Sequence, residues 1–232
     1  LICWSSLIIV GLVKLLNFKA FSLFLSKNDL NFIYDYFPDF ESKQVQQLES
    51  LFTIYKDWNS RINVISRKDM DFFYLHHVLH SLSIAKFRTF KASSRILDVG
   101  TGGGFPGVPL AIVFPEVRFH LADSVGKKIK VINDVKEKLG LDNISTHYDR
   151  VENLEFKVDF VVCRAVAPLE TLMNWSAYRI SSQHNHLIRN GFLCLKGGDL
   201  SDELSNFKNA KVLPLKEYFS EAFFETKKLV YC

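Results

Sequence analysis

The chain has 232 residues and a mass of 26.7 kDa, which fits one domain of ordinary size or one domain with a small helical attachment. Hydrophobic residues make up 48% and charged residues 23%, so a disordered chain and a collagen-like repeat are excluded. The net charge is +4, but Lys14, Lys19 and Lys27 lie in a first segment without acids, which leaves +1 for the rest. Bulk charge therefore identifies no partner, and any phosphate contact must come from local clusters.

The first segment, residues 1–27, is interpreted as a hydrophobic N-terminal extension outside the folded domain. Its apolar stretch before Lys14 is 13 residues long, too short to span a bilayer, and no basic region precedes it. We expect no membrane contact except through residues 1–25, which could form an amphipathic helix at a membrane surface.

Residues 28–92 are predicted to form a small helical unit. Apolar residues recur at intervals of three and four between Asp39 and Trp58, which predicts a helix with Asp39 or Ser42 as its N-cap. A second helix is expected to begin at Ser66, with Asp69 completing a pattern like a capping box, and to run to Phe87.

Residues 93–232 show a different sequence pattern, in which short apolar runs alternate with segments of helical periodicity. The expected strands are Arg95–Val99, Arg118–Ala122, Asn143–Tyr148, Val158–Cys163 and Gly191–Lys196, and the expected helices are Val108–Phe114, Gly126–Leu139 and Leu169–Ile180. This alternation predicts βαβ units, and hence an α/β fold with a parallel sheet between helices. The tail, Lys211–Glu217 and Phe223–Tyr231, is expected to close the sheet as a strand pair.

The four cysteines, Cys3, Cys163, Cys194 and Cys232, are scattered without a Cys-x-x-Cys pair. We therefore expect reduced thiols and a cytoplasmic protein.

Five of the eleven glycines lie between Gly100 and Gly107, directly after the first expected strand. Glycines at this point let the backbone turn tightly and approach a ligand at the carboxyl edge of the sheet. A merely tight turn between strand and helix is the alternative, but the density of glycines favours a ligand site.

Two ligand classes fit this loop. Gly102-x-Gly104-x-x-Gly107 matches the dinucleotide fingerprint, and Asp123, at the end of the second strand, could hold ribose hydroxyls of either ligand. Asp98, inside the first strand, favours a ligand that carries a cation instead of a pyrophosphate. Pro106 and Pro109 crowd the helix start that a pyrophosphate would use. The loop therefore favours S-adenosylmethionine over NAD.

Several motifs together resemble one family, the bacterial 16S rRNA (guanine-N7)-methyltransferases, also called glucose-inhibited division protein B or methyltransferase G. They run in family order from about Leu30 to the C-terminus: Trp58-Asn59, Asn63-Val64-Ile65-Ser66, His77-Val78-Leu79-His80-Ser81, Asp98-Val99-Gly100-Thr101-Gly102, Gly104-Phe105-Pro106-Gly107-Val108-Pro109-Leu110, Asp123-Ser124, Gly126-Lys127-Lys128, Arg150-Val151-Glu152, Cys163-Arg164-Ala165 and Leu195-Lys196-Gly197. The run from Gly104 to Pro109 is far more specific than a generic methyltransferase loop.

The resemblance implies a Rossmann-like methyltransferase fold, with a mostly parallel seven-stranded sheet and an antiparallel C-terminal strand. It implies an S-adenosylmethionine site that contains Gly100, Phe105, Asp123, Val151, Glu152 and Arg164, and the loop itself adds Asp98 and Gly102 to the expected site residues. It also implies 16S rRNA, or the small ribosomal subunit, as the partner, and we expect no stable protein partner. The chain departs from the family pattern at His80, where many relatives have Asp, and at Cys163, where Ser is usual.

The implied chemistry needs no general base, because guanine N7 is an unprotonated lone pair on the major-groove edge. We therefore expect positioning groups and assign no residue an acid or base role. Arg164 is the candidate to orient the base or a phosphate, and the alternative is a structural ion pair with Glu152. Phe105 could pack on the methyl donor, stack on the target base or belong to the core. A methyltransferase acting on a small molecule and a non-catalytic protein that binds S-adenosylmethionine remain as alternative functions.

Two further clusters have functional and structural interpretations. A lysine cluster at the start of the helix after Asp123, joined by four other basic residues, could form an RNA-facing rim or a solvated face: Lys127, Lys128 and Lys130, with Arg61, Arg67, Lys68 and Lys196. His76 and His80, four residues apart, could share a metal on a helix face, but no third ligand is evident, so we expect no metal.

Overall fold

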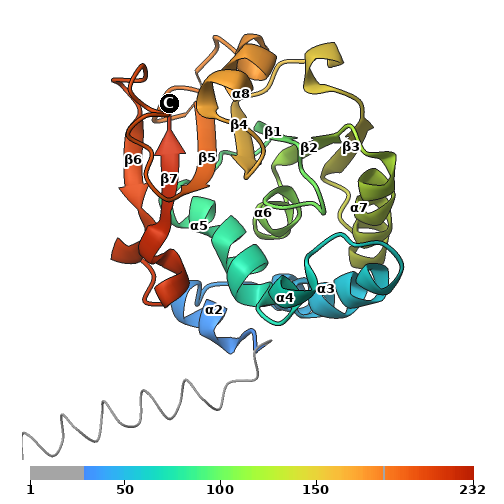
Figure 1. Cartoon of the computed structure of the whole chain (residues 1–232). Helices are drawn as coiled ribbons and strands as arrows, with labels where there is room; N and C mark the ends of the chain where they lie inside the picture. Colours follow the sequence, from blue (N-terminus) through green and yellow to red (C-terminus); the bar gives the residue numbers. More distant parts are fainter. Residues whose placement is uncertain (1–28, 185) are drawn as a thin grey trace, which may run out of the picture.

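The computed structural model describes residues 29–184 and 186–232, so the expected extension over residues 1–27 lies outside the described residues. The described chain forms a sheet with helices on both faces (Figure 1). None of the helices within these two ranges is long and apolar enough to cross a membrane.

The sheet has seven strands in the order β3-β2-β1-β4-β5-β7-β6. The pairs among the first five strands are parallel, whereas β7 pairs antiparallel with both β5 and β6. The expected parallel sheet and closing strand pair are therefore confirmed. The strands are β1 (Arg95–Val99), β2 (Arg118–Asp123), β3 (Ile144–Tyr148), β4 (Phe160–Arg164), β5 (Gly191–Gly197), β6 (Lys211–Pro214) and β7 (Lys227–Tyr231).

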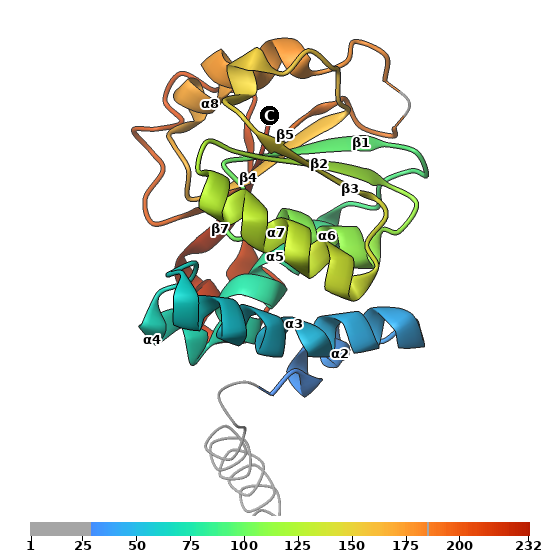
Figure 2. The same ribbon diagram turned by 90° about the vertical axis from the view of Figure 1, so that its right-hand side faces the viewer.

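Helices cover the two faces of the sheet unequally. In Figure 2, α8 (Leu169–Ser176) lies on one face, and α5 (His80–Phe87), α6 (Gly107–Val113) and α7 (Gly126–Leu139) lie on the other. The earlier helices form a further layer beneath α6 and α7: α2 (Asn31–Tyr36), α3 (Ser42–Arg61) and α4 (Arg67–Met70). Within the helical unit, α5 therefore packs against the sheet, whereas α2, α3 and α4 form a layer outside it.

The first long helix begins differently from the prediction. Neither Asp39 nor Ser42 caps α3. Its N-cap is Glu41, whose side chain accepts from the backbone of Gln44, while the Gln44 side chain accepts from the Glu41 N–H at 2.8 Å. This reciprocal capping box satisfies two backbone donors at once, which a single Asp or Ser cap would not do.

The second predicted helix is not continuous. Ser66 is its N-cap, as expected, and its Oγ accepts from the Asp69 N–H at 3.2 Å. However, α4 ends at Met70, a turn follows, and the π-helical segment η1 (Tyr74–Leu79) leads into α5. Apolar spacing over so few turns does not distinguish an α-helix from a π-helical turn, because both bury one face.

Four other predicted boundaries were wrong by two residues or more. The strand predicted to reach Glu217 ends at Pro214, because residues Leu215–Glu217 form a 3₁₀ helix. Val158 forms only an isolated bridge with Ile180, so β4 begins at Phe160. The helix predicted to reach Ile180 ends at Ser176 and continues as a 3₁₀ turn. The last strand begins at Lys227 because residues Ala222–Thr226 form a 3₁₀ helix.

The core forms two clusters, one on each face of the sheet, because successive strand residues point to opposite sides. In β1, Ile96 belongs to the cluster that faces the helical unit and Leu97 to the cluster beneath α8. The first cluster is shared with α3 through Leu51 and Tyr55, both fully buried. Burying one such large side chain stabilises the fold by roughly 1.5–3 kcal/mol. Because the helical unit and the sheet bury their apolar side chains in the same cluster, each contributes to the stability of the other.

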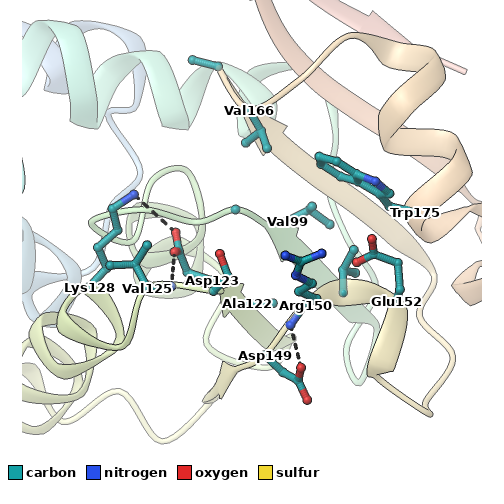
Figure 3. Close-up of a pocket in the computed structure, with 14 residues that line it drawn as sticks. Val99, Ala122, Asp123, Val125, Lys128, Asp149, Arg150, Glu152, Val166 and Trp175 are labelled. Carbon is teal, nitrogen blue, oxygen red and sulfur yellow. Dashed lines mark hydrogen bonds and ion pairs between the residues drawn. The ribbon is translucent and has the colours of Figure 1, made fainter.

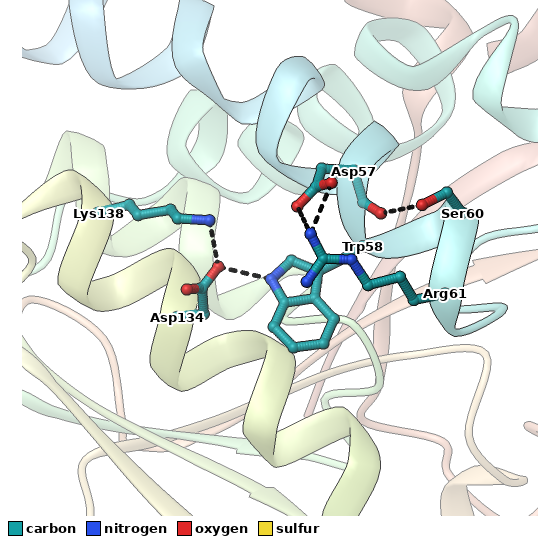
Figure 4. A network of polar contacts seen from close by, with 6 residues as sticks. All are labelled: Asp57, Trp58, Ser60, Arg61, Asp134 and Lys138. Atoms are coloured by element: carbon teal, nitrogen blue, oxygen red, sulfur yellow. Dashed lines mark hydrogen bonds and ion pairs between the residues drawn. The ribbon is translucent and has the colours of Figure 1, made fainter.

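Polar contacts fix α3 against α7 (Figure 4). The indole N–H of Trp58 donates to Asp134 Oδ2 at 2.6 Å, and Lys138 Nζ lies 2.8 Å from the same oxygen. Gln47 also donates to the carbonyl of Leu139, at the last turn of α7. These bonds hold the helical unit against α7, the helix that follows β2. They therefore fix the helical unit on one side of the glycine loop.

Candidate active site

The loop after β1 adopts the backbone conformations that its glycines allow. Gly100, Gly102 and Gly104 have φ angles of 60°, 61° and 94°, in the left-handed region that other residues rarely adopt. A Cβ at Gly100 would stand 2.8 Å from Val166 Cγ1, in the loop that follows β4. Glycine is therefore required here both by φ and by the close approach of a second loop.

Asp98 holds this loop from beneath. Its carboxylate is fully buried, and Oδ2 accepts from the Thr101 hydroxyl at 2.6 Å and from the Gly107 N–H at 2.8 Å. Oδ1 has no partner among the described residues. Burial raises the pKa of Asp98 to about 7, while the two hydrogen bonds and the charge of Arg164 oppose this rise. Asp98 thus links Thr101, near the start of the glycine loop, to Gly107 at its end.

Asp123, at the end of β2, holds the loop from the side. Its Oδ2 accepts from the Gly102 N–H at 2.9 Å, its Oδ1 accepts from the Val125 N–H at 2.8 Å, and Lys128 Nζ lies 3.7 Å from Oδ2. A carboxylate has about four acceptor positions, so each oxygen can still accept a further hydrogen bond.

A cavity of about 530 Å³ opens at the carboxyl ends of the parallel strands (Figure 3). Its walls include four of the predicted S-adenosylmethionine residues: Gly100, Asp123, Val151 and Glu152. The 3₁₀ turn η2 (Val151–Asn153) after β3 carries the last two. Tertiary structure thus brings three separate loops together around one cavity, and contact of these residues with S-adenosylmethionine stays a prediction.

The other four predicted residues do not line this cavity. Asp98 and Gly102 act on its walls through the hydrogen bonds described above. Phe105 is buried, with its ring 5.0 Å from that of Tyr55 and 5.9 Å from that of Phe73. Of the three expectations for Phe105, the structure places its ring in the core.

Arg164 does not line the cavity, and its guanidinium is held by other parts of the chain. Its guanidinium lies 5.1 Å over the Phe105 ring, and it donates to the His76 carbonyl at 2.9 Å and to His77 Nδ1 at 2.8 Å. Both Arg164 and Glu152 are described, and they form no ion pair, so the alternative interpretation of Arg164 was wrong on this point. Burial lowers the pKa of Arg164 to about 10, so the guanidinium remains charged at neutral pH.

His76 and His80 belong to packed aromatic clusters. His76 Nδ1 lies 3.0 Å from Asp69 Oδ1, and its ring stacks on Phe223 at 4.3 Å. His80 is buried against Phe223 and Phe224. Within residues 29–184 and 186–232 no three His, Cys, Asp or Glu side chains are grouped so that they could hold a metal ion.

Three members of the predicted basic rim are held in ion pairs, one of them Lys128, which pairs with Asp123 as described above. Arg61 bonds Asp57 at 2.7 Å on the same helix. Lys196 donates to the Ala167 carbonyl at 2.6 Å and pairs with Glu203 at 2.8 Å. An exposed ion pair such as that between Arg61 and Asp57 contributes little to stability, but it reduces the positive charge that is available to bind RNA.

Sequence reasoning missed several walls of the cavity: Ser124, Val125, Arg150, Ala165, Val166 and Trp175. It also expected Lys128 in either an RNA-facing rim or a solvated face, whereas Lys128 lines the cavity. Ala165 and Val166 directly follow β4, so the rule that parallel strands end at one edge could have found them. Trp175 lies on α8, eleven residues after Arg164, and only the packing of that helix brings it here.

The sheet order, the antiparallel β7 and the glycine loop beside Asp123 define a Rossmann-like S-adenosylmethionine-dependent methyltransferase fold. Solved structures with this fold resemble the chain. An S-adenosylmethionine-dependent O-methyltransferase from Thermotoga maritima matches with a TM-score of 0.54 and 16% identity, over 80% of this chain and 69% of that one. A precorrin-6y C5,15-methyltransferase from Geobacter metallireducens matches with a TM-score of 0.50 and 13% identity, over 73% and 90%. At such identities the likeness shows the fold alone.

Sequence comparison identifies the family. The family model GidB, described as rRNA small subunit methyltransferase G, matches residues 44–230. Proteins named ribosomal RNA small subunit methyltransferase G are 53% identical in Christiangramia forsetii, over 87% of this chain and 96% of the relative, and 48% identical in Parabacteroides distasonis, over 93% of both. The chain belongs to the GidB family of rRNA small subunit methyltransferases, and the resemblance inferred from its motifs is confirmed.

Proposed function

We propose that this chain transfers a methyl group from S-adenosylmethionine to N7 of a guanine in 16S rRNA. One observation carries the proposal most directly: Gly100 and Asp123 face one cavity at the carboxyl ends of β1 and β2. That edge of an open parallel sheet is where such folds bind their ligands. Membership of the GidB family supports the RNA substrate.

The cavity walls fit S-adenosylmethionine. Glycine at position 100 lets the loop approach Val166 closely, and both residues line the part of the cavity that we assign to the methionine part of this ligand. The free acceptor positions of Asp123 suit the two ribose hydroxyls. Val151 and Trp175 supply apolar surface for the adenine ring. When bound, S-adenosylmethionine supplies an electrophilic methyl group on its sulfonium.

The remaining task of the protein is to orient the acceptor. Guanine N7 already carries a free lone pair, so no side chain has to remove a proton. Holding two reactants in line at contact distance can lower a barrier by roughly 7–11 kcal/mol. We assign this positioning role to Arg164, because its planar guanidinium is held by His76 and His77 and the two residues that follow it in the chain, Ala165 and Val166, line the cavity.

The test uses the purified chain, methyl-labelled S-adenosylmethionine and small ribosomal subunits that lack the modification. We expect label in 16S rRNA, recovered as 7-methylguanosine after nuclease digestion. Label that appears in small metabolites and not in RNA would favour a small-molecule methyltransferase. Calorimetric binding of S-adenosylmethionine without transfer to any RNA, from a folded sample, would favour a non-catalytic binding protein.

Because the proposed substrate is a ribosomal subunit, we also propose that the protein acts in the cytoplasm. Cell fractionation in which the protein follows ribosomal subunits and soluble proteins is the expected result. Its recovery only with membranes would contradict this and would direct attention to residues 1–25.

A further inference from the structure

A π-helical segment holds the guanidinium of Arg164. The segment η1 (Tyr74–Leu79) interrupts the regular helical hydrogen bonding, and the His76 carbonyl within it accepts from Arg164 Nη1 at 2.9 Å. Arg164 Nη2 lies 2.8 Å from His77 Nδ1, and the guanidinium lies over Phe105. Two hydrogen bonds from different nitrogens and one ring face together fix the plane of the guanidinium.

The contact with His77 determines the protonation of the imidazole. A guanidinium has only donors, so Nδ1 must accept and cannot carry a proton. The single ring proton of His77 is therefore on Nε2, which is buried and has no partner among the described residues. The charged or titratable groups that act on this ring are Arg164, His76 and Asp69. Burial, followed by the charge of Arg164, lowers the pKa of His77 to about 3, so the ring is neutral at every physiological pH.

We infer that His77 is a positioning residue for methyl transfer: its neutral Nδ1 orients Arg164, which in turn orients the target nucleotide. The inference rests on the proposed function. A guanidinium has five N–H groups, of which one Nη1–H and one Nη2–H are used here, so the others remain for RNA. Without the acceptor at His77, only the hydrogen bond from Nη1 to the His76 carbonyl would remain. The guanidinium could then rotate about that hydrogen bond, and the N–H groups that face no protein acceptor would no longer have a fixed direction.

The experiment compares His77→Asn with His77→Leu in the full chain. The Asn side-chain oxygen can replace Nδ1 as acceptor at a similar distance from the backbone, whereas Leu fills similar space without an acceptor. For methylation of small subunits, we expect His77→Leu to lower kcat by roughly 10- to 100-fold, and His77→Asn to restore most of it. We expect the Kd for S-adenosylmethionine to stay within about twofold in both variants, because His77 does not line the cavity.

His80→Leu is the matched control, since His80 is a buried histidine at the first position of α5, directly after η1, and makes no hydrogen bond to Arg164. It should keep the wild-type kcat. Nitrogen-15 spectra of the histidine rings give an independent readout: His77 should show a proton on Nε2 only and no titration between pH 5 and 8.

Three results would overturn the inference alone while the wild-type chain methylates RNA: a wild-type kcat in a folded His77→Leu variant, no rescue by His77→Asn, or a proton on Nδ1. A wild-type chain that binds S-adenosylmethionine but methylates no RNA would overturn the proposed function as well. The two failures are therefore distinguishable.

Discussion

The hydroxyl of Tyr55, on α3, donates a hydrogen bond to the backbone carbonyl of Gly103, in the glycine loop after β1. Tyr55 is fully buried, and burial raises the pKa of its hydroxyl far above the usual range, so it remains a donor at all ordinary pH values. A Cβ at Gly103 would stand 2.5 Å from Val64 Cγ1, so the helical unit also packs tightly against the loop. The helical unit therefore supports the side of the loop that faces away from the cavity.

Replacing Tyr55 by Phe tests this support. The loss of one buried hydrogen bond should lower the free energy of unfolding by about 0.5–1.5 kcal/mol and leave the Gly103 carbonyl unpaired. Because that carbonyl belongs to the loop, we expect the Kd for S-adenosylmethionine to rise a few-fold. Tyr74→Phe is the control: its hydroxyl donates to the Glu49 carbonyl at 2.9 Å, inside the helical unit. Equal effects of both variants on binding would argue against the role of Tyr55.

Gly100→Ala should weaken S-adenosylmethionine binding. An L-residue at φ 60° costs about 1–2 kcal/mol, and the new Cβ would also push Val166 into or away from the cavity. We expect roughly a tenfold or larger rise in Kd by calorimetric titration. Gly140→Ala offers a matched control, since Gly140 has the same φ but nothing within 4 Å of a Cβ, and it ends α7 far from the loop. It should lose similar stability and keep wild-type binding.

Asp123→Asn should also weaken binding. The amide keeps one acceptor oxygen, but it loses the charge and cannot accept from both the Gly102 and Val125 N–H groups. A hydrogen bond to a charged group contributes about 1.5–3 kcal/mol, so the Kd should rise by roughly 10- to 100-fold. Asp57→Asn, which changes an exposed carboxylate on α3, should leave binding unchanged. Wild-type affinity in Asp123→Asn would remove Asp123 from the site.

The contact between α3 and α7 can be measured with a double-mutant cycle on Trp58 and Asp134. Trp58→Phe and Asp134→Asn each disturb the hydrogen bond of 2.6 Å between them. We expect a coupling energy of about 1 kcal/mol from urea unfolding of the two single variants and the double variant. A coupling energy of zero would mean that the bond does not hold the two helices together.

Acid should destabilise the fold through its buried histidines. Burial, aided by Arg164 and Lys227, lowers the pKa of His80 well below 6.5 in the native state. Below pH 6.5 the unfolded chain therefore binds a proton that the native chain does not. The free energy of unfolding should fall by up to about 1.4 kcal/mol per pH unit for this residue, and above pH 6.5 it should be unaffected.

Comparing the wild type with His80→Leu at pH 7.5 and pH 5.5 isolates this contribution. His77, His120 and Asp98 remain in both proteins, so their own pH dependence cancels in the comparison. Urea unfolding should show a smaller loss of stability at pH 5.5 in His80→Leu. An equal loss in both proteins would mean that His80 binds its proton in the native state.

The amino-acid sequence by itself determined the strands, the glycine loop and the position of Asp123. Buried parallel strands read as short apolar runs, and glycine tolerates a φ of 60° that other residues avoid, so both features are local and visible in the order of residues. The rule that parallel strands end at one edge then placed Gly100 and Asp123 together. Family motifs added Val151 and Glu152, and these also line the cavity.

Only the tertiary structure decided where long side chains point. Arg164 and Phe105 are close in sequence to residues that line the cavity. The guanidinium of Arg164 nevertheless lies over the buried ring of Phe105 and bonds His76 and His77, almost ninety residues earlier. Trp175 reaches the cavity only because α8 packs over the sheet. Local sequence sets the backbone, but the direction of a flexible side chain follows from partners that are distant in the chain and close only after folding.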